Sequence, residues 1–407
     1  MPALVSQGSL ALWGIVSILV ARHLPDDAYA VYAMARSIEM FAGLLGGGFV
    51  LQALLKLGSE RPSDETSKAA NTAILLTLFF AVAATALLFL FRNLLDGFYG
   101  NLDLSPVIPA IALVVLTGAL AHIPRNLLLT RLGTRQVMYA DLVSFSVRGG
   151  IVGWLIVSGA LTGAVQVLLA SALANVAAFI IGLWNARGLF DPGAGIGRKQ
   201  LSRVARFALY SLGTSLAGFV YTRTDILMLG KLAPPEDVAA YGASRALTSM
   251  MVLVSAAANM VLLPAISREW SLGVRKGVIG RTMKALVMVQ LVQLPIVVLL
   301  VSSPRWVIDA IYKGRYTDNW RILAILGGLA VIKPIGSLFS TTGAAVSKPQ
   351  YSFWSVLVSA CVNVLLNILL IPGMGGTGAA LATAAAVLAG SAAVVVPTVR
   401  YCRREAG

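Results

Sequence analysis

Charged side chains inside apolar stretches are the residues of this chain best placed to do chemistry. Six cations and three carboxylates occur in such stretches: Arg36, Arg125, Arg148, Arg223, Arg245 and Lys333, and Glu39, Asp141 and Asp225. At the centre of a membrane helix each costs about 2.5–3.5 kcal/mol on insertion scales, so such residues usually face a polar interior or pair with each other. The excess of cations predicts a water-filled cavity for an anion such as a diphosphate, because guanidinium groups donate in a planar fork and stay protonated.

Five of the cations are candidates for contacting that anion. Arg36 and Arg245 lie about one turn inside their stretches, where they either snorkel to the membrane interface or serve a cavity or gate. Arg148 and Lys333 lie nearer the middle of their stretches, which favours a functional role over snorkelling. Arg223 is the fifth candidate.

The three carboxylates are candidates for ion coupling or for structural pairs with arginines. Glu39 and Asp141 fit either role, and Asp225 is equally open between a functional role and pairing with another helix. Asp225 is not expected to pair with Arg223, because residues two apart on a helix point to different faces. Arg125 follows a proline near one end of its stretch, which favours anchoring at the interface.

Uncharged polar residues and helix breakers complete the pattern. Asn363 and Asn367 are four apart and share a helix face that could line a cavity. His122 is interpreted as a hydrogen-bonded packing residue. The run Gly46–Gly48 allows close packing or bending, and four prolines within or ending apolar stretches indicate kinks useful for gating: Pro124, Pro264, Pro295 and Pro334.

Membrane-spanning helices are the elements that must position these side chains. Hydrophobic residues make up 58% of the 407 residues, charged residues only 12%, and the mean hydropathy is +0.83, whereas a soluble domain carries about 25% charged residues. Apolar runs of about 20 residues, enough to span the hydrocarbon core, recur along the chain. They predict an all-α polytopic membrane protein with twelve spans: Ala3–Ala21, Tyr32–Leu55, Ala70–Phe91, Pro106–Leu129, Val137–Ser158, Leu161–Trp184, Phe207–Leu229, Ala239–Leu263, Ala285–Ser302, Ile322–Thr342, Phe353–Ile371 and Gly376–Val399.

The distribution of basic residues predicts the orientation of these spans. Segments that follow even-numbered spans hold nineteen Lys or Arg, and the connections on the opposite side hold seven. Cytoplasmic loops carry the excess of Lys and Arg, so both termini are expected in the cytoplasm. The net charge of +15 is thereby explained without nucleic acid, and anionic lipid headgroups are the expected partners of the basic stretch Arg198–Arg206.

The longest polar connection, Asn185–Arg206, divides the chain into two halves of six spans each. We expect an N-terminal lobe over residues 1–184, a basic cytoplasmic linker over 185–206 and a C-terminal lobe over 207–407. A shift of 209 residues aligns the halves without a gap, which indicates pseudo-symmetric lobes with a binding site between them. The matched residues are Arg22 with Lys231, Pro25 with Pro234, Tyr32 with Tyr241, Arg36 with Arg245, and Glu60 with Glu269.

Four motifs, in their order and spacing, resemble one transporter family. Asp225–Lys231, Ala240–Ala243, Leu263–Ser267 and Leu370–Ala380 are similar to segments of the Wzx-type polysaccharide flippases, in the multidrug/oligosaccharidyl-lipid/polysaccharide exporter superfamily. The resemblance implies a two-lobed, V-shaped helical bundle with a central cavity, in a bacterial inner membrane. It implies an undecaprenyl-diphosphate-linked oligosaccharide as cargo, a polysaccharide polymerase and glycosyltransferases as partners, and no cofactor. The chain is short for this family, which leaves the true start of the first span open.

Two other classes of function remain open. A multidrug or organic-cation exporter of the same superfamily would favour an acidic cavity, against the cationic excess here. A membrane-embedded glycosyl ligase or polymerase would need a sizeable extracytoplasmic region, and the largest connections on that side are Arg92–Ser105 and Ser303–Arg321. The sequence contains no phosphate-binding loop or zinc-protease motif, and Cys361 and Cys402 have no metal-ligand spacing, so neither an enzyme nor a metal site is expected.

Overall fold

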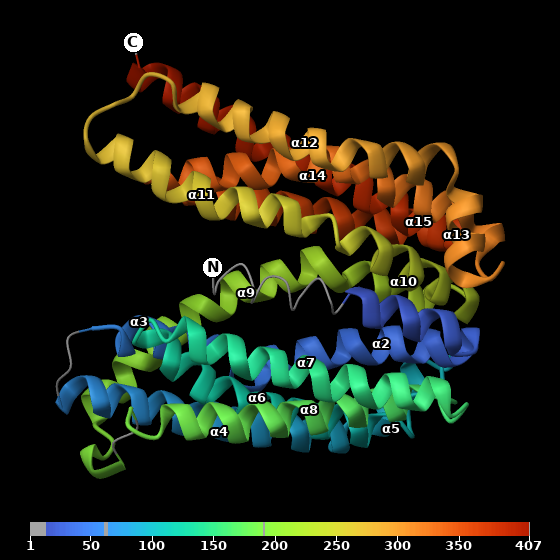
Figure 1. Ribbon diagram of the computed structural model, residues 1–407, viewed down its shortest axis with the longest axis horizontal. Helices are drawn as coiled ribbons and strands as arrows, with labels where there is room; N and C mark the ends of the chain where they lie inside the picture. The colour runs from blue at the N-terminus through green and yellow to red at the C-terminus, as the bar shows by residue number, and fades with distance from the viewer. Residues whose placement is uncertain (1–13, 61–63, 190–191, 407) are drawn as a thin grey trace. The chain divides into compact units, whose positions relative to one another are not determined.

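The protein is helical throughout the part of the chain that the structure describes. The computed structural model describes residues 14–60, 64–189 and 192–406, and within these ranges it contains no β-strand. The all-α prediction is therefore confirmed (Figure 1). The chain divides into two compact units, Met1–Leu216 and Ala217–Gly407, which we call unit 1 and unit 2.

Unit 1 is built around one central helix. Helix α6 packs against α2, α3, α4, α7 and α8. The bounds of the elements are α2 Asp26–Gly43, the π-helical turn η1 Leu44–Gly48, α3 Phe49–Gly58, α4 Asp64–Leu90, α5 Arg92–Phe98, α6 Ile108–Thr130, α7 Thr134–Val157, α8 Ala164–Ala186 and the short 3-10 turn η2 Pro192–Ala194. Helix α9, Arg198–Leu232, begins in unit 1 and ends in unit 2.

Unit 2 has the same plan. Its central helix is α14, which packs against α10, α11, α12, α13 and α15. The elements are α10 Pro235–Ser249, α11 Val252–Ser271, α12 Val278–Ser302, α13 Pro304–Tyr312, the 3-10 turn η3 Thr317–Asn319, α14 Trp320–Ala345 and α15 Gln350–Ala406. The central helices of the two units contain the fourth and the tenth predicted spans, which are equivalent positions in a repeat of six.

Helix α15 contains two predicted spans folded back on each other. The backbone at Gly375 leaves the helical region, with φ 52° and ψ −133°. Ser355 Oγ donates to the carbonyl of Gly390 at 2.7 Å, and Ser359 Oγ donates to the carbonyl of Ala386 at 3.0 Å. Because one partner residue number rises as the other falls, the two halves of α15 run antiparallel.

The twelve-span prediction agrees with the described helices. Nine helices in the described ranges are long and apolar enough to cross a membrane. Splitting α15 at its turn adds a tenth span and α9 covers the seventh predicted one. The apolar helix Gly14–His23 is the described end of the first, whose residues before position 14 lie outside the described part.

The predicted linker 185–206 is more regular than its polarity suggested. Its last residues form the first turns of α9, which starts at Arg198. This stretch is amphipathic, because Val204 is fully buried while Arg203 reaches out to Glu60, with 2.7 Å between Nη2 and Oε1. The lobe boundary itself stays a prediction.

The internal repeat is also present in the positions at which equivalent helices begin and are interrupted. Helix α2 starts at Asp26 and α10 starts at Pro235, which are 209 residues apart, as the sequence shift requires. Both spans are also interrupted, the first by η1 and the second at Met250–Met251, between α10 and α11. Two compact units with equivalent breaks are the expected result of a duplicated six-helix lobe.

The break in the first unit depends on one glycine. Gly47 has φ 103° and ψ 0°, a left-handed conformation that L side chains rarely adopt. A Cβ at this position would lie 2.9 Å from the Cα and Cγ2 of Thr77 in α4. The structure therefore confirms the bend expected from the glycine run and shows that only glycine fits there.

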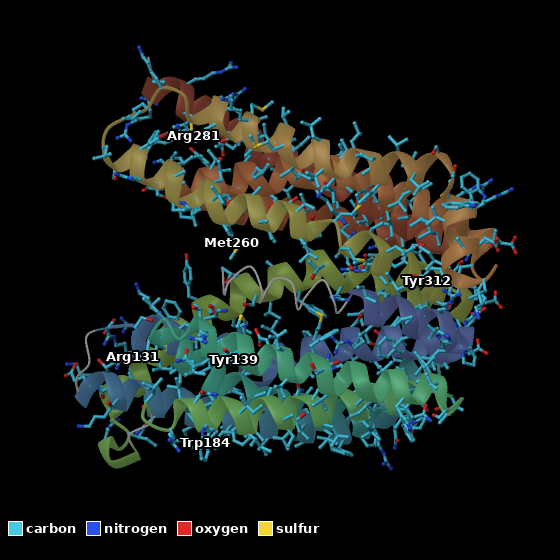
Figure 2. The ribbon with its side chains drawn as sticks, viewed as in Figure 1. Arg131, Tyr139, Trp184, Met260, Arg281 and Tyr312 are labelled. Carbon is cyan, nitrogen blue, oxygen red and sulfur yellow. The ribbon has the colours of Figure 1, made fainter. Side chains whose placement is uncertain are left out.

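The outer surfaces of the units are apolar, as a membrane requires. Trp184 of α8 and Leu291 of α12 are both 68% exposed, and the label of Trp184 lies at the edge of unit 1 in Figure 2. Within unit 2, Arg281 and Tyr312 lie at opposite ends (Figure 2). Their segments were predicted on opposite sides of the membrane, so the fold of unit 2 is compatible with that topology.

Candidate functional site

A cavity of about 590 Å³ lies in unit 1. Its wall is formed by α2, η1, α3, α6, α7 and α8. Five charged side chains line it: Arg36, Glu39, Arg125, Asp141 and Arg148. This is where the structure gathers most of the intramembrane charge of the first half.

Helix α2 contributes a pair of neighbouring charges. Arg36 Nη1 donates to Glu39 Oε2 across one turn of the helix, and both side chains are partly buried. Positions three apart lie on the same face of a helix. The pair therefore presents a guanidinium and a carboxylate to the cavity together.

A second ion pair joins α6 to α7. Arg125 Nε donates to Asp141 Oδ1 at 3.2 Å and Arg125 Nη2 donates to Asp141 Oδ2 at 3.4 Å. His122, one turn earlier on α6, lines the same cavity. The sequence favoured interface anchoring for Arg125, whereas the structure places it on the cavity wall, because Asp141 of the next helix faces it.

Arg148 on α7 is the third arginine of the cavity. It is only 7% exposed and lies two turns along α7 from Asp141. Among the described residues that line the cavity, three arginines stand against two carboxylates, Glu39 and Asp141. The cavity therefore carries an excess of one positive charge with its acidic residues ionised.

Small and polar residues shape the rest of the wall. Gly46 and Gly118 line the cavity, and a Cβ on them would lie 3.2 Å from Val115 Cγ1 and 3.4 Å from Asn175 Nδ2, respectively. Asn175 of α8 donates to the carbonyl of Val114 and to Thr117 Oγ1, both at 3.4 Å. The wall thus combines charged side chains with one amide side chain, that of Asn175.

Unit 2 holds a different, compact network around Asp225 of α9. Asp225 is 2% exposed and accepts from Arg245 Nη1 at 3.0 Å and from the hydroxyl of Tyr241. Arg245 also donates to the carbonyl of Thr222, and Tyr241 Oη lies 3.1 Å from Thr383 Oγ1. The network ties α9, α10 and α15 together through Asp225, Tyr241, Arg245 and Thr383.

Asparagines on α15 continue this network. Asn367 Nδ2 donates to Asn363 Oδ1 at 3.0 Å, and Asn363 Nδ2 lies 3.5 Å from Thr383 Oγ1. The shared face expected for the two asparagines is therefore used for contacts within unit 2. Tyr241 and Thr383 were not singled out as site residues, although Tyr241 was visible as the repeat partner of Tyr32.

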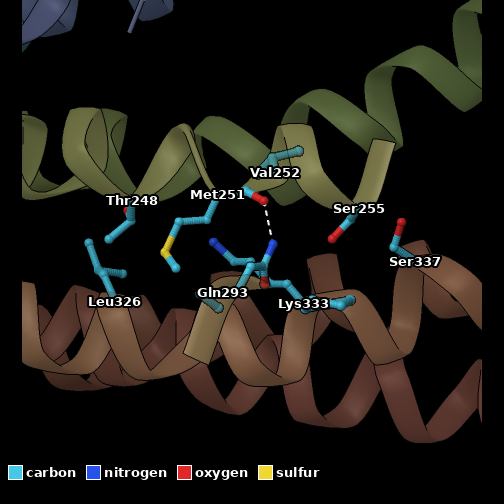
Figure 3. A pocket seen from close by; sticks show the side chains of 10 residues that line it. Thr248, Met251, Val252, Ser255, Gln293, Leu326, Lys333 and Ser337 are labelled. Atoms are coloured by element: carbon cyan, nitrogen blue, oxygen red, sulfur yellow. Dashed lines mark hydrogen bonds between the residues drawn. The ribbon is translucent and has the colours of Figure 1, made fainter. Parts of the chain in front are cut away.

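Lys333 and Arg223 lie apart from these groups. Lys333 of α14 lines a second cavity of about 60 Å³ in unit 2 (Figure 3), and Arg223 belongs to α9 and does not line either of these two cavities. Arg36 and Arg148 share a cavity, whereas Arg245 and Lys333 belong to unit 2. The assignment of these five cations to an anion site stays a prediction. In the described ranges no group of His, Cys, Asp or Glu could hold a metal ion.

Comparison with known sequences finds a matching protein family and similar proteins from two organisms. The sequence profile of a family described as "polysaccharide biosynthesis protein" matches residues 19–321. The probable low-salt glycan biosynthesis flippase Agl15 of Haloferax volcanii is 22% identical over 186 residues, which are 46% of this chain and 39% of that protein. The uncharacterized membrane protein MJ1068 of Methanocaldococcus jannaschii is 26% identical over 123 residues, 30% of this chain and 24% of that protein. The alignments thus span about two fifths or less of the length of these relatives.

Solved structures show the same fold. The lipid II flippase MurJ in an inward closed conformation is similar with a TM-score of 0.81 at 15% identity, covering 100% of this chain and 89% of that one. An inward-facing multidrug resistance MATE family transporter of the MOP superfamily has a TM-score of 0.73 at 16% identity, covering 98% and 95%. The predicted fold of the superfamily is therefore confirmed.

Proposed function

The chain belongs to the polysaccharide biosynthesis protein family, and from that premise we propose that it flips a lipid-diphosphate-linked oligosaccharide across the membrane. The observation that carries the proposal is the arginine-lined cavity of unit 1. Similarity to a probable glycan flippase and to the fold of a lipid II flippase supports it.

The size of the cavity suits the polar part of such a lipid. Its volume of about 590 Å³ falls in the range of roughly 300–1,000 Å³ that is usual for ligand pockets. A diphosphate and its first sugar fit that space, while the polyprenyl tail stays in the bilayer. The wall offers guanidinium groups for the phosphates and the amide of Asn175 for a sugar hydroxyl.

The charge of the cavity favours an anionic cargo. Arg36 contacts Glu39 and Arg125 contacts Asp141, and the three arginines of the lining outnumber its two carboxylates by one. At a separation of 4 Å and an effective dielectric constant near 20, one pair of unit charges interacts by about 4 kcal/mol. A diphosphate entering beside three arginines therefore gains attraction that a neutral or cationic drug does not, which disfavours the multidrug-exporter alternative.

Transport, and not chemical conversion, is the proposed activity. The lobes would alternate access around the bound headgroup, as in other transporters built from repeats. We further propose a bacterial inner membrane with both termini in the cytoplasm, an undecaprenyl carrier, and a polymerase and glycosyltransferases that use the same lipid. The lobes of this proposal are residues 1–184 and 207–407.

Reconstitution tests the proposal directly. The purified full-length protein is placed in liposomes that contain a fluorescent polyprenyl-diphosphate oligosaccharide, and an impermeant quencher reports the fraction in the outer leaflet. We expect exchange between leaflets without ATP, with the lipid recovered chemically unchanged. An intrinsic ATP requirement, a new glycosidic bond, or exchange no faster than in protein-free liposomes would overturn the proposal.

A further inference from the structure

One end of unit 2 collects more than half of its basic side chains. It is formed by the last turn of α11, the connection to α12, the first turns of α12, the connection between α14 and α15, and the last turns of α15. We call residues 268–284, Lys348 and residues 400–405 the basic end. The α11–α12 connection lies beside the C-terminus in Figure 1, and Arg281 is labelled at this end in Figure 2.

Side-chain contacts hold the segments of the basic end together. The rings of Trp270 in α11 and Tyr401 in α15 have centroids 5.8 Å apart. Lys348 Nζ, from the connection between α14 and α15, lies 4.7 Å from the centroid of the Tyr401 ring. Glu269 of α11 forms an ion pair with Arg281 of α12. Segments that are far apart in the sequence therefore meet at one surface.

The charge of this surface is strongly unbalanced. The basic end holds nine cations and two carboxylates, whereas residues 231–237 and 303–321, at the other end of unit 2, hold five cations and four carboxylates. Arg281 is the one cation of the basic end that forms an ion pair within the described part of the chain. Because cations gathered on one surface repel each other, an anion from outside the chain stabilises this end.

Two of these cations are held against aromatic rings. Arg275 Cζ lies 3.8 Å from the centroid of the Trp270 ring, and Arg275 Nη1 donates to the carbonyl of Trp270 at 2.7 Å. Lys348 rests on Tyr401 in the same way. A guanidinium group carries five N–H donors and an ammonium group three, so both keep donors for an anion. Side chains that are already positioned also lose less freedom when they bind.

The neighbouring side chains indicate that the anion belongs to a lipid. Trp and Tyr are enriched where membrane helices meet the headgroups, and Trp270 and Tyr401 are half-buried near the ends of their helices. On the same connection as Arg275, Leu272 is 71% exposed and Val274 is 47% exposed. Apolar side chains exposed beside cations suit a molecule with an anionic head and apolar chains. A soluble acidic protein or a nucleic acid offers no such chains.

We infer that the basic end of unit 2 binds the headgroup phosphate of an anionic phospholipid, with Arg275 and Lys348 as its main contacts. Leu272 and Val274 then lie at the boundary between the headgroups and the acyl chains. The inference does not rest on the proposed function, because the ligand is an ordinary membrane lipid and the arginine-lined cavity lies in unit 1.

Thermal unfolding with added lipid tests this surface. Purified full-length protein in a neutral detergent is heated with increasing phosphatidylglycerol, with phosphatidylcholine of the same acyl chains, or with glycerol phosphate. We expect saturable stabilisation by phosphatidylglycerol at lower concentration than by phosphatidylcholine, because a ligand that binds the folded state stabilises it. Added salt should weaken this preference, since it screens exposed charges. Equal responses to the two lipids, or an equal response to glycerol phosphate, would overturn the inference.

A matched pair of double variants identifies the contacts. Arg275→Gln with Lys348→Gln should raise the phosphatidylglycerol concentration for half-maximal stabilisation about thirtyfold, or about fivefold for each cation removed. The control is Arg305→Gln with Arg321→Gln, because these arginines lie 5.3 and 5.7 Å from the centroid of the Trp320 ring at the other end of unit 2. The control should respond like wild type. An unchanged response in the first variant, or an equal change in both, would contradict the assignment.

Discussion

Removing the carboxylate of Asp225 should leave Arg245 without its partner and destabilise unit 2. Asp225 is 2% exposed and accepts from Arg245, from Tyr241 and from the backbone N–H of Ile226. Breaking one side of a buried ion pair usually costs about 3–5 kcal/mol. The side chain of Arg245 is 27% exposed, so water screens part of its charge, and we expect about 3 kcal/mol for Asp225→Ala.

The two cysteines make a convenient assay. Cys402 is buried and Cys361 is exposed, so in a Cys361→Ser background a thiol-reactive dye reports unfolding through Cys402. Asp225→Ala should lower the midpoint temperature. Asp225→Ala combined with Arg245→Met should recover part of the loss, because replacing a buried ion pair by apolar groups is often neutral or stabilising.

A double-mutant cycle measures the coupling between the two residues. If Asp225→Ala alone unfolds at the wild-type temperature, the pair does not contribute as the geometry suggests. If the double variant is less stable than both single variants, the cost lies elsewhere than in the unpaired arginine. Either result would refute this account of the network.

Three further predictions follow from particular residues. Gly47→Ala should lower the midpoint temperature, because the φ of 103° at Gly47 and the contact with Thr77 exclude a Cβ. Gly43→Ala is the control and should not lower it, because nothing lies within 4 Å of a Cβ at that position. Equal stability of the two variants would contradict the account of the bend. In a cysteine-free background, Ser158→Cys should react with an impermeant thiol reagent added to intact cells and Ser271→Cys should not; the opposite pattern would reverse the predicted topology. Tyr312→Phe should destabilise unit 2 by about 1–3 kcal/mol, because Tyr312 Oη donates to the buried carbonyl of Ala243 at 2.9 Å. Burial raises the pKa of Tyr312, so its folded form resists deprotonation. Wild type should then lose stability as the pH rises above about 10, and an equal loss in Tyr312→Phe would show that another group titrates.

The spans could be predicted from the sequence because hydropathy and length determine them locally. The bilayer imposes a minimum apolar length on each helix, and the 209-residue repeat was visible in matched residues such as Pro25 and Pro234. The structure then begins α2 and α10 at equivalent positions. The helical start of α9 was missed because its basic residues lower its hydropathy, although they lie on one side of an amphipathic helix.

Partners of the charged residues could not be predicted in the same way. Which helix faces Arg125 or Arg245 depends on the rotation of helices about their axes, which packing sets and local sequence does not. Asp141 and Asp225 were recognised as possible partners of arginines, but not which arginine each one binds. The sequence also treated Arg148 and Lys333 as equivalent, whereas the structure gives them cavities of about 590 and 60 Å³.

Direct binding of the lipid headgroup tests the central claim most sharply. The affinity of purified protein for polyprenyl diphosphate, polyprenyl monophosphate and the uncharged alcohol is measured for wild type, Arg148→Gln and Arg148→Lys. Arg131→Gln, in the turn between α6 and α7 outside the cavity lining, is the control. We predict that wild type and Arg131→Gln bind the diphosphate more tightly than the monophosphate and the alcohol. In Arg148→Gln the affinity for the diphosphate should fall about thirtyfold or more. Arg148→Lys should keep part of this affinity, because the positive charge remains while the planar fork is lost. Equal affinity for the diphosphate and the alcohol in wild type, or an unchanged affinity in Arg148→Gln, would contradict the account.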